Sequence, residues 1–188
     1  MNNNIPALII INGASATGKT VIGQKISKEF NLPFINKDEY KELIFDHLGW
    51  SNLEWSDKVD KTSFHILWNI AEKLLAAKMS VIIETKFDPV LSQKDIEILT
   101  RKYEFKIFQI LCYASGEELL TRFKKRALSD RHPGHCDANN LDKYDAELKK
   151  GKLEVIKIPG KTIEIDTTDL DNIDYKTIRR EIKKVLKG

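Results

Sequence analysis

Gly13-Ala14-Ser15-Ala16-Thr17-Gly18-Lys19-Thr20 is the stretch of this 188-residue sequence that says most about its fold. It matches the pattern G-x-x-x-x-G-K-[ST] and stands between a strand-like run, Ala7–Asn12, and a segment with helical spacing. Its glycines let the backbone curl so that successive N–H groups point inward, and the helix N-terminus adds partial positive charge. The stretch is therefore predicted to bind phosphate groups, with Lys19 as the mobile cation and Thr20 as a ligand of Mg²⁺.

Strand-like and helix-like segments alternate along the chain. Short apolar runs, typical of strands buried on both faces, occur at Ala7–Asn12, Pro33–Ile35, Val81–Ile83, Phe105–Leu111 and Thr162–Ile165. Helical spacing of apolar residues, as in Ile22, Ile26 and Phe30, separates them. Right-handed crossovers then predict a doubly wound α/β fold, a three-layer sandwich with five parallel strands and helices on both faces. With the motif at residues 13–20, this is the architecture expected of a P-loop NTPase. Ligands of such sheets bind beyond the carboxyl ends of the strands.

Length and composition favour one domain over residues 1–188. A content of 41% hydrophobic and 31% charged residues excludes disordered and collagen-like proteins. The net charge of +3 is too small to attract nucleic acid or a membrane over the whole surface, and no apolar run approaches the ~20 residues that span a bilayer. Two cysteines exclude a disulfide framework, and no signal peptide is visible, so we expect a cytoplasmic protein.

Size, element order and turns resemble those of the small P-loop kinases, above all the group that contains chloramphenicol phosphotransferase, zeta toxins and polynucleotide 5′-kinases. The resemblance covers nearly the whole chain, and the phosphate-binding motif is its most specific part. It implies a Mg²⁺-dependent enzyme that moves the γ-phosphoryl group of ATP to a hydroxyl of a small-molecule or nucleotide-like acceptor. GTPases match less well, because Asn36-Lys37-Asp38-Glu39 ends in Glu where their guanine-reading N-K-x-D motif ends in Asp.

The turns after the second and third strands contain candidate acceptor groups. The resemblance implies that Asp38 orients or deprotonates the acceptor hydroxyl and that Lys41, where the family usually has Arg, holds the substrate with a single charge. It places Glu84 near Mg²⁺ or the acceptor. Helix capping is the alternative role of Asp38, and a solvated strand end is that of Glu84. Asp88, before Pro89, is predicted to cap the next helix.

A basic helix belongs to a region of about residues 116–150 that we predict to be a helical lid. Its buried stripe is Leu119, Leu120 and Phe123, and Arg122 and Arg126 are neighbours four residues apart that should project together. The resemblance places Arg122 near the adenine and Arg126 at the phosphates, where a cation offsets the charge of phosphoryl transfer. An ordinary solvated helix face is the alternative.

A turn follows that helix, with the sequence Arg131-His132-Pro133-Gly134-His135-Cys136-Asp137. It resembles a string in uncharacterised bacterial members of the same group. Its Pro-Gly pair favours a type II turn that brings the two histidines together. Arg131, His132 and His135 are candidate acceptor-binding residues. Packing of a fixed turn is the alternative role, and a zinc site of His132, His135 and Cys136 is a weaker one.

The last strand runs into Asp166-Thr167-Thr168-Asp169, a loop that borders the adenine in similar kinases, so Thr168 is a candidate nucleotide-binding residue. Helix capping explains Thr168 and Asp169 nearly as well. The expected partners are ATP and a hydroxyl-bearing small molecule, with nucleic acid less favoured and no membrane. Two functions remain as alternatives: a polynucleotide 5′-hydroxyl kinase, and a nucleotide-gated binding protein with little transfer activity. A nucleoside monophosphate kinase is disfavoured, since no D-G-[FY]-P-R-like string lies near the third strand.

Overall fold

The computed structural model of the chain describes residues 5–129, 131–139 and 141–187, and its centre is a sheet of five parallel strands. In spatial order they are β2 (Phe34–Asn36), β3 (Val81–Glu84), β1 (Ala7–Gly13), β4 (Lys106–Tyr113) and β5 (Lys161–Asp166). The isoleucine-rich β1 lies in the middle and is buried along its whole length. The five predicted strands are confirmed, with ends that differ by a residue or two.

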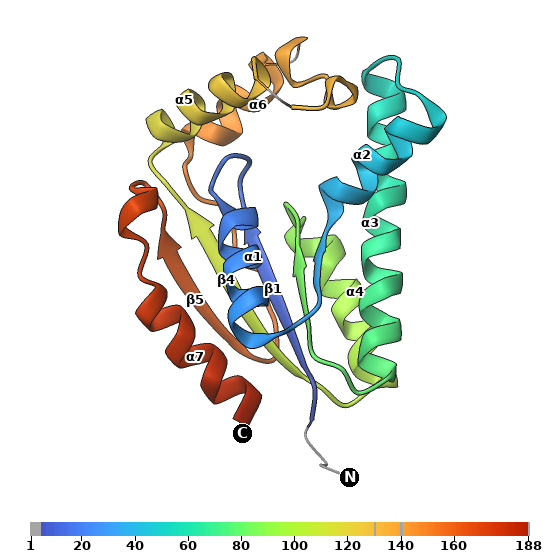
Figure 1. Cartoon of the computed structure of the whole chain (residues 1–188), viewed down its shortest axis with the longest axis vertical. Helices are drawn as coiled ribbons and strands as arrows, with labels where there is room; N and C mark the ends of the chain where they lie inside the picture. The colour runs from blue at the N-terminus through green and yellow to red at the C-terminus, as the bar shows by residue number, and fades with distance from the viewer. Residues whose placement is uncertain (1–4, 130, 140, 188) are drawn as a thin grey trace.

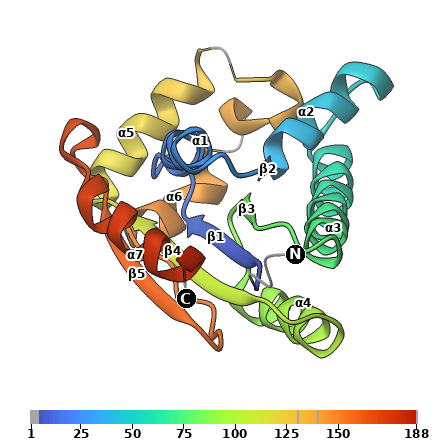
Figure 2. The same cartoon turned by 60° about the horizontal axis from the view of Figure 1, so that its bottom comes forward.

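Helices connect the strands and flank the sheet (Figures 1 and 2). They are α1 (Lys19–Phe30), α2 (Lys37–Leu48), α3 (Leu53–Ala76), α4 (Pro89–Lys102), α5 (Gly116–Ala127), α6 (Leu141–Lys149) and α7 (Tyr175–Lys187), with the short 3₁₀ helices η1 (Pro133–His135), η2 (Asp137–Asn139) and η3 (Leu170–Asn172). Within the described ranges, none of these helices is long and apolar enough to cross a bilayer.

Alternate residues of β1 belong to two separate apolar clusters. Ile9 and Ile11 pack with α1 and α7, through side chains such as Ile22 and Ile178. The other face of the sheet, which includes Leu8 of β1, packs with α3 and α4. This alternation follows from the twofold period of a strand. The predicted P-loop NTPase fold, a three-layer α/β sandwich, is confirmed.

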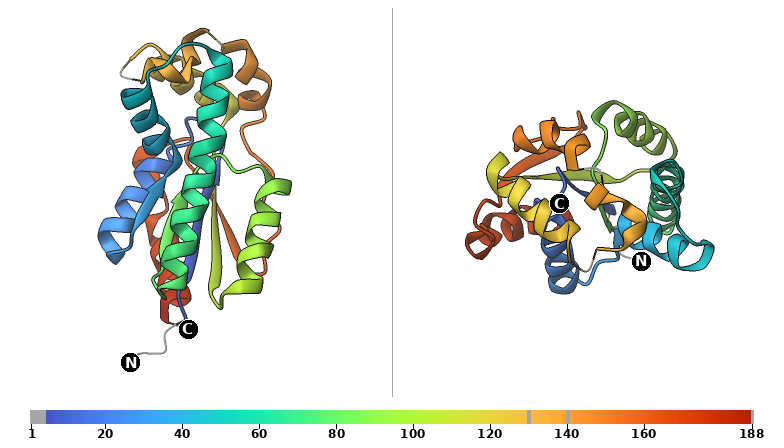
Figure 3. Two further views of the ribbon diagram at one scale, coloured as in Figure 1. Left: turned by 90° about the vertical axis from the view of Figure 1, so that its right-hand side faces the viewer. Right: turned by 90° about the horizontal axis from the view of Figure 1, so that it is seen from above.

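Residues 116–150 lie across the carboxyl ends of the strands, above β1 and opposite α2 (Figures 1 and 3). A third apolar cluster holds this region down, and in it Ala14 of the phosphate-binding stretch packs with Leu119, Phe123 and Leu148. The predicted lid therefore contacts the phosphate-binding stretch directly. Two residues of the lid region, Asp130 and Asn140, lie outside the described residues.

Candidate functional site

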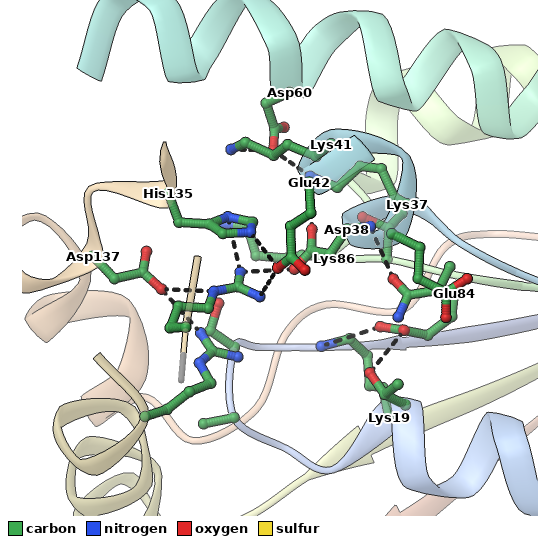
Figure 4. Close-up of a pocket in the computed structure, with 18 of the residues that line it drawn as sticks. Lys19, Lys37, Asp38, Lys41, Glu42, Asp60, Glu84, Lys86, His135 and Asp137 are labelled. Carbon is green, nitrogen blue, oxygen red and sulfur yellow. Dashed lines mark hydrogen bonds and ion pairs between the residues drawn. The ribbon is translucent and has the colours of Figure 1, made fainter. Parts of the chain in front are cut away.

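A cavity of about 700 Å³ opens at the carboxyl ends of the central strands, between residues 13–20, α2 and the α5–α6 region (Figure 4). Among the residues that the sequence predicted for the site, its lining includes Ser15, Ala16, Gly18, Lys19, Thr20, Asp38, Lys41, Glu84, Arg122, Arg126, Arg131 and His135. The other candidates, Gly13, Ala14, Thr17, His132 and Thr168, do not belong to the described lining. Candidate donor-binding and acceptor-binding residues thus share one cavity.

The phosphate-binding stretch takes its shape from two glycines with positive φ. At Gly13, φ is 152°, and a Cβ atom would lie 2.3 Å from the carbonyl oxygen of Cys112 on the neighbouring strand β4. At Gly18, φ is 75°, and this residue is the N-cap of α1, without a side-chain hydrogen bond to the helix. Polar side chains cap the starts of α2, α3, α4 and α5. Because α1 alone among these five helices begins without a side-chain cap, its first N–H groups can bind an anion.

Asn12, which the sequence analysis did not single out, fixes the start of this stretch. Its Oδ1 accepts hydrogen bonds from the backbone N–H of Gly13 at 2.7 Å and of Phe87 at 3.0 Å. It is fully buried and ties residues 13–20 to the loop after β3, which begins next to Glu84. A polar residue inside an otherwise apolar strand was the sequence signal for this role.

Lys19, Thr20 and Glu84 form a compact group in the lining of the cavity, and Figure 4 labels Lys19 and Glu84. The Thr20 hydroxyl donates to Glu84 Oε2 at 3.0 Å, and Lys19 Nζ lies 3.9 Å from Glu84 Oε1 and donates to the Ala14 carbonyl at 2.9 Å. Burial lowers the pKa of Lys19 and raises that of Glu84. A hydroxyl beside a carboxylate is an oxygen donor set that fits Mg²⁺, whose other ligands are commonly water and substrate phosphates.

Asp38 lies on the opposite wall, in the first turn of α2. The capping role considered for it is wrong, because Asn36 is the N-cap and its side chain accepts from the Asp38 N–H at 2.8 Å. The Asp38 carboxylate instead accepts from Arg131 Nη2 at 2.8 Å and lies 3.4 Å from Lys37 Nζ. Burial by itself raises the pKa of Asp38, but the charges of Lys37 and Arg131 outweigh it and hold that pKa well below its usual range.

Two buried lysines of α2 meet one carboxylate of α3. Lys37 and Lys41 both donate to Oδ1 of Asp60, the latter at 3.0 Å (Figure 4). Lys41 lines the cavity and is held there by Asp60, and its role in holding the acceptor stays a prediction. Sequence reasoning missed Lys37 and Asp60. Their positions, at the start of one helix and within the next, gave no sign that they pair.

Arg131 connects three carboxylates around the cavity. Besides Asp38, it contacts Glu42 Oε1 through Nη1 at 3.3 Å and Asp137 Oδ2 through Nε at 3.3 Å. Glu42 and Asp137 were also missed, although Glu42 follows Asp38 by four residues and so shares its helix face. A guanidinium can serve several carboxylates at once because it carries five N–H donors in one plane.

The predicted type II turn at Pro133-Gly134 is wrong, because residues 133–135 form η1 and Gly134 does not have the positive φ that such a turn requires. His132 caps η1 by accepting from the Gly134 N–H at 3.0 Å. Gly134 is needed for space, since a Cβ atom there would lie 2.5 Å from the Phe45 ring. The two histidines do come together, stacked and edge-on against the same Phe45 ring.

The ring nitrogens of both histidines have protein partners. His132 contacts the Gly134 N–H and Asp46, while His135 Nδ1 accepts from Arg131 at 3.0 Å and Nε2 donates to Glu42 at 2.8 Å. Burial lowers the pKa of His135, which favours its neutral form. Within the described residues, no group of three or more His, Cys, Asp or Glu side chains is arranged to hold a metal ion. The zinc alternative therefore finds no support in the geometry.

Arg122 and Arg126 both reach the cavity but diverge. Arg122 donates to the carbonyls of Thr167 at 2.9 Å and Thr168 at 2.7 Å, and so holds the loop after β5 against α5. Arg126 lies 3.4 Å from Asp137, and its buried Nε has no hydrogen-bond partner among the described residues. The Nε donor of Arg126 is thus unused but covered, so it would reach a ligand only after the side chain moved, whereas the three donor nitrogens of Arg122 are engaged.

Thr168 makes a long-range hydrogen bond, and Asp88 makes local ones. The Thr168 hydroxyl accepts from the Ser115 N–H at 3.0 Å and so joins the loop after β5 to the start of α5. Asp88 caps α4 as predicted, accepting from Val90 and Leu91, each at 2.9 Å.

Comparison with known proteins assigns the family. Residues 8–150 match the family model AAA_33, described as an AAA domain. The chain belongs to the AAA_33 family. Over 179 residues, 89% of this chain and 93% of the relative, it is 25% identical to a shikimate kinase of Dictyoglomus turgidum. A 109-residue stretch, 55% of this chain and 54% of the relative, is 27% identical to a "putative adenylate kinase" of Saccharolobus solfataricus.

Solved structures agree with the family. This AAA_33 protein is 34% identical to a "putative kinase" from Chloroflexus aurantiacus, with 97% of this chain and 100% of that chain covered and a TM-score of 0.87. A gluconokinase from Sinorhizobium meliloti, 16% identical with 97% and 95% covered, has a TM-score of 0.56 and shows the shared fold. The AAA_33 protein is thus a small P-loop kinase, and its relatives support phosphotransferase activity in general, with ATP and Mg²⁺ as that family implies.

Proposed function

We propose that this protein transfers the γ-phosphoryl group of ATP to a hydroxyl of a small-molecule acceptor. The observation that carries the proposal is the shared cavity, in which the phosphate-binding stretch with Lys19 faces Asp38 on α2. The two walls are close enough for the Asp38 charge to act on both Lys19 and Glu84. This is the arrangement that a donor phosphate and an acceptor hydroxyl need if they are to meet.

The donor side would bind the triphosphate through backbone N–H groups and cations. The uncapped start of α1 and the curled backbone of residues 13–18 would bind the β and γ phosphates, with Lys19 moving from the Ala14 carbonyl to the phosphates. Thr20 and Glu84 would hold Mg²⁺, which neutralises phosphate charge when bound. Arg122 would place the loop at Thr168 beside the base, and Arg126 would offer its free Nε to the transferred group.

The acceptor side would orient a hydroxyl on Asp38. In the transfer, the acceptor oxygen forms a bond to the γ phosphorus, the bond to the bridging oxygen of ADP breaks, and the hydroxyl proton passes through Asp38 to water. A carboxylate whose pKa is held so low is a weak base, so positioning is its main contribution. That suffices, since phosphoryl transfer through a loose transition state needs little deprotonation of the nucleophile. Lys41, Arg131 and His135 would line the acceptor pocket.

We further propose that residues 1–188 act as one domain and that residues 116–150 act as its lid. The lid packs on the phosphate-binding stretch through the cluster that contains Ala14 and Leu119. A nucleotide bound to that stretch would therefore change the packing of the lid. Closure of this region would exclude water and bring Arg126 to the phosphates.

Two substitutions and two matched controls test the function. With γ-labelled ATP and a mixture of small hydroxyl compounds, Lys19→Ala is expected to lower transfer by about 10²–10³-fold. Asp38→Asn should lower it about 10²-fold and leave the ATP dissociation constant within twofold. Lys28→Ala, on an exposed position of α1, and Asp88→Asn, which keeps the α4 cap, should transfer like the wild type.

Wild-type turnover by the Lys19→Ala protein would contradict the proposed function. So would tight ATP binding by the wild type without transfer to any acceptor, which is the result expected of a nucleotide-gated binding protein. Isothermal titration with ATP beside the transfer assay separates these outcomes.

A further inference from the structure

Three acidic residues of α2 stand on one face of the helix and meet the segment after α5. Asp38, Glu42 and Asp46 are spaced four residues apart, which places them in one row. Arg131 pairs with Asp38 at 2.8 Å, His135 with Glu42 at 2.8 Å and His132 with Asp46 at 3.2 Å. Residues 131–137, called the latch below, are thereby attached along most of α2 (Figures 1 and 4).

The latch also packs on an apolar side chain of α2, the ring of Phe45. Phe45 is 1% exposed, and the ring of His132 stacks on it with centroids 5.2 Å apart while His135 meets it edge-on at 5.8 Å. Gly134 lies so close to this ring that a side chain there would displace it. Contacts of this closeness fit one docked position of the latch, which distinguishes it from a loop held by surface charge alone.

A second connection lies on the other side of the cavity. Lys86, in the loop after β3, pairs with Glu147 of α6 at 2.9 Å. With the latch on α2 and this pair at α6, the region above the sheet is attached to the body of the protein on both sides of Asp38. A polynucleotide that delivers its end to Asp38 needs an open groove for the rest of the strand, and two connections across the cavity would narrow such a groove.

The chemistry of the acceptor wall favours hydroxyl groups over bases. Around Asp38 the wall offers cations and carboxylates in alternation, among them Lys37, Lys41, Glu42 and Asp60. A sugar-like hydroxyl donates and accepts at once and so suits both signs of charge. Recognition of unpaired bases relies on stacking against aromatic rings, and the described lining of the cavity contains two, Tyr144 and His135, of which His135 already packs edge-on against Phe45.

We propose that the latch determines acceptor specificity: it closes the acceptor side over a small polyhydroxylated molecule that is enclosed whole, and it excludes the end of a polynucleotide. This inference rests on the proposed function and adds to it the class of acceptor and the segment that selects it. His132 and Asp46 act from outside the cavity lining, so they are positioning residues and not catalytic ones.

An acceptor experiment tests the substrate class. The wild-type protein is given γ-labelled ATP with the small-molecule filtrate of a bacterial lysate in one arm and a 5′-hydroxyl oligonucleotide in the other. Label is expected in the filtrate arm, in a product that periodate cleaves because it keeps neighbouring hydroxyls, and not in the oligonucleotide.

Label in the oligonucleotide, or only in a periodate-resistant product, overturns the acceptor class and leaves the phosphotransferase proposal standing. Label in neither arm, with ATP bound, overturns the proposed function itself. The two failures are therefore distinguishable.

A variant experiment tests the latch without knowledge of the acceptor. His132→Ala removes the stack on Phe45 and the pair with Asp46, so water should enter and phosphate released per phosphate transferred should rise about tenfold. His47→Ala, an exposed histidine next to Asp46 whose ring contacts the Leu43 carbonyl, is the matched control and should leave that ratio unchanged. The ATP dissociation constant should stay within twofold in both.

An unchanged ratio in His132→Ala overturns the latch. If that variant does not fold, Asp46→Ala breaks the same contact from an exposed side chain and should raise the ratio in the same direction. Trp50, edge-on to His132 with centroids 6.5 Å apart, gives a fluorescence readout of latch release that a mere loss of activity would not move.

Discussion

The two halves of the cavity are built by different means. The side that we propose for phosphate is made by consecutive residues, and Gly13 and Gly18 matter there because their positive φ lets the backbone curl. The side that we propose for the acceptor is made by charged side chains from α2, α3 and the segment after α5, joined in pairs such as Arg131 with Asp38. A single substitution that alters the backbone should abolish binding on the first side. A single substitution in the charge network should remove only part of the activity.

Gly13→Ala should produce the largest effect. A small effect would contradict the view that backbone shape determines this side of the cavity. The new Cβ atom would lie 2.3 Å from the Cys112 carbonyl, at a φ that alanine rarely adopts, so we expect a loss of about 3 kcal/mol in the free energy of unfolding and no measurable ATP binding. Gly49→Ala is the control, because φ there is 81° but no atom lies within 4 Å of the added Cβ. Urea unfolding should show a smaller loss for the control, about 2 kcal/mol, because its φ of 81° and ψ of 170° are strained for alanine but no clash is added. Equal losses in the two variants would contradict the role of close approach.

Arg131→Ala should affect the acceptor side alone. Its removal leaves Asp38, Glu42 and Asp137 without their shared cation, so transfer should fall about 10–100-fold while ATP affinity stays within twofold.

The same variant should change the pH dependence. Because Arg131 and Lys37 hold the pKa of Asp38 below its ordinary value, the wild-type carboxylate stays charged as the pH falls to about 4. Without Arg131 that pKa rises, and the acidic limb of the transfer rate should move to higher pH. A pH profile between 3 and 8 for both proteins checks this, and identical acidic sides of the two profiles would mean that Asp38 does not depend on Arg131.

Ala16→Gly should have the smallest effect and sharpens the account of the phosphate side. Ala16 has a φ of 66°, a conformation that costs a non-glycine residue about 1–2 kcal/mol, and glycine would relieve most of that while it loses more chain entropy. We expect the free energy of unfolding to rise by about 0.5 kcal/mol, as measured by thermal unfolding. Ala14→Gly is the matched control and should destabilise, because Ala14 is buried and packs with α5 and its φ is not positive.

Sequence reasoning succeeded where the structure depends on neighbours in the chain. The strands, the phosphate-binding stretch and the Asp88 cap all follow from residues a few positions apart. Asp60 could not be found this way, because it becomes part of the site only when α3 packs beside α2 and brings it to the lysines. Asp137 lies only six residues after Arg131, but no regular spacing in that irregular segment indicated that the two pair.

The errors in the same analysis have local physical causes. Asp38 was considered as a cap, but the backbone entered the helix two residues earlier and Asn36 took that role. At Pro133-Gly134 the glycine indicated a turn with positive φ, whereas the structure uses it for the space beside Phe45. A glycine that makes room for a ring and a glycine that permits an unusual φ look the same in one sequence.

Because the N-terminus of α1 has no capping side chain, the stability of the fold should depend on the bound nucleotide. The helices α2 to α5 carry their own capping side chain, but α1 begins at Gly18 and would receive its cap from the phosphates of the nucleotide. Resistance to unfolding should then rise with nucleotide concentration, by about 2.7 kcal/mol when ATP is present at 100 times its dissociation constant. The ATP concentration would thereby influence the lifetime of the folded protein, independently of its catalytic rate.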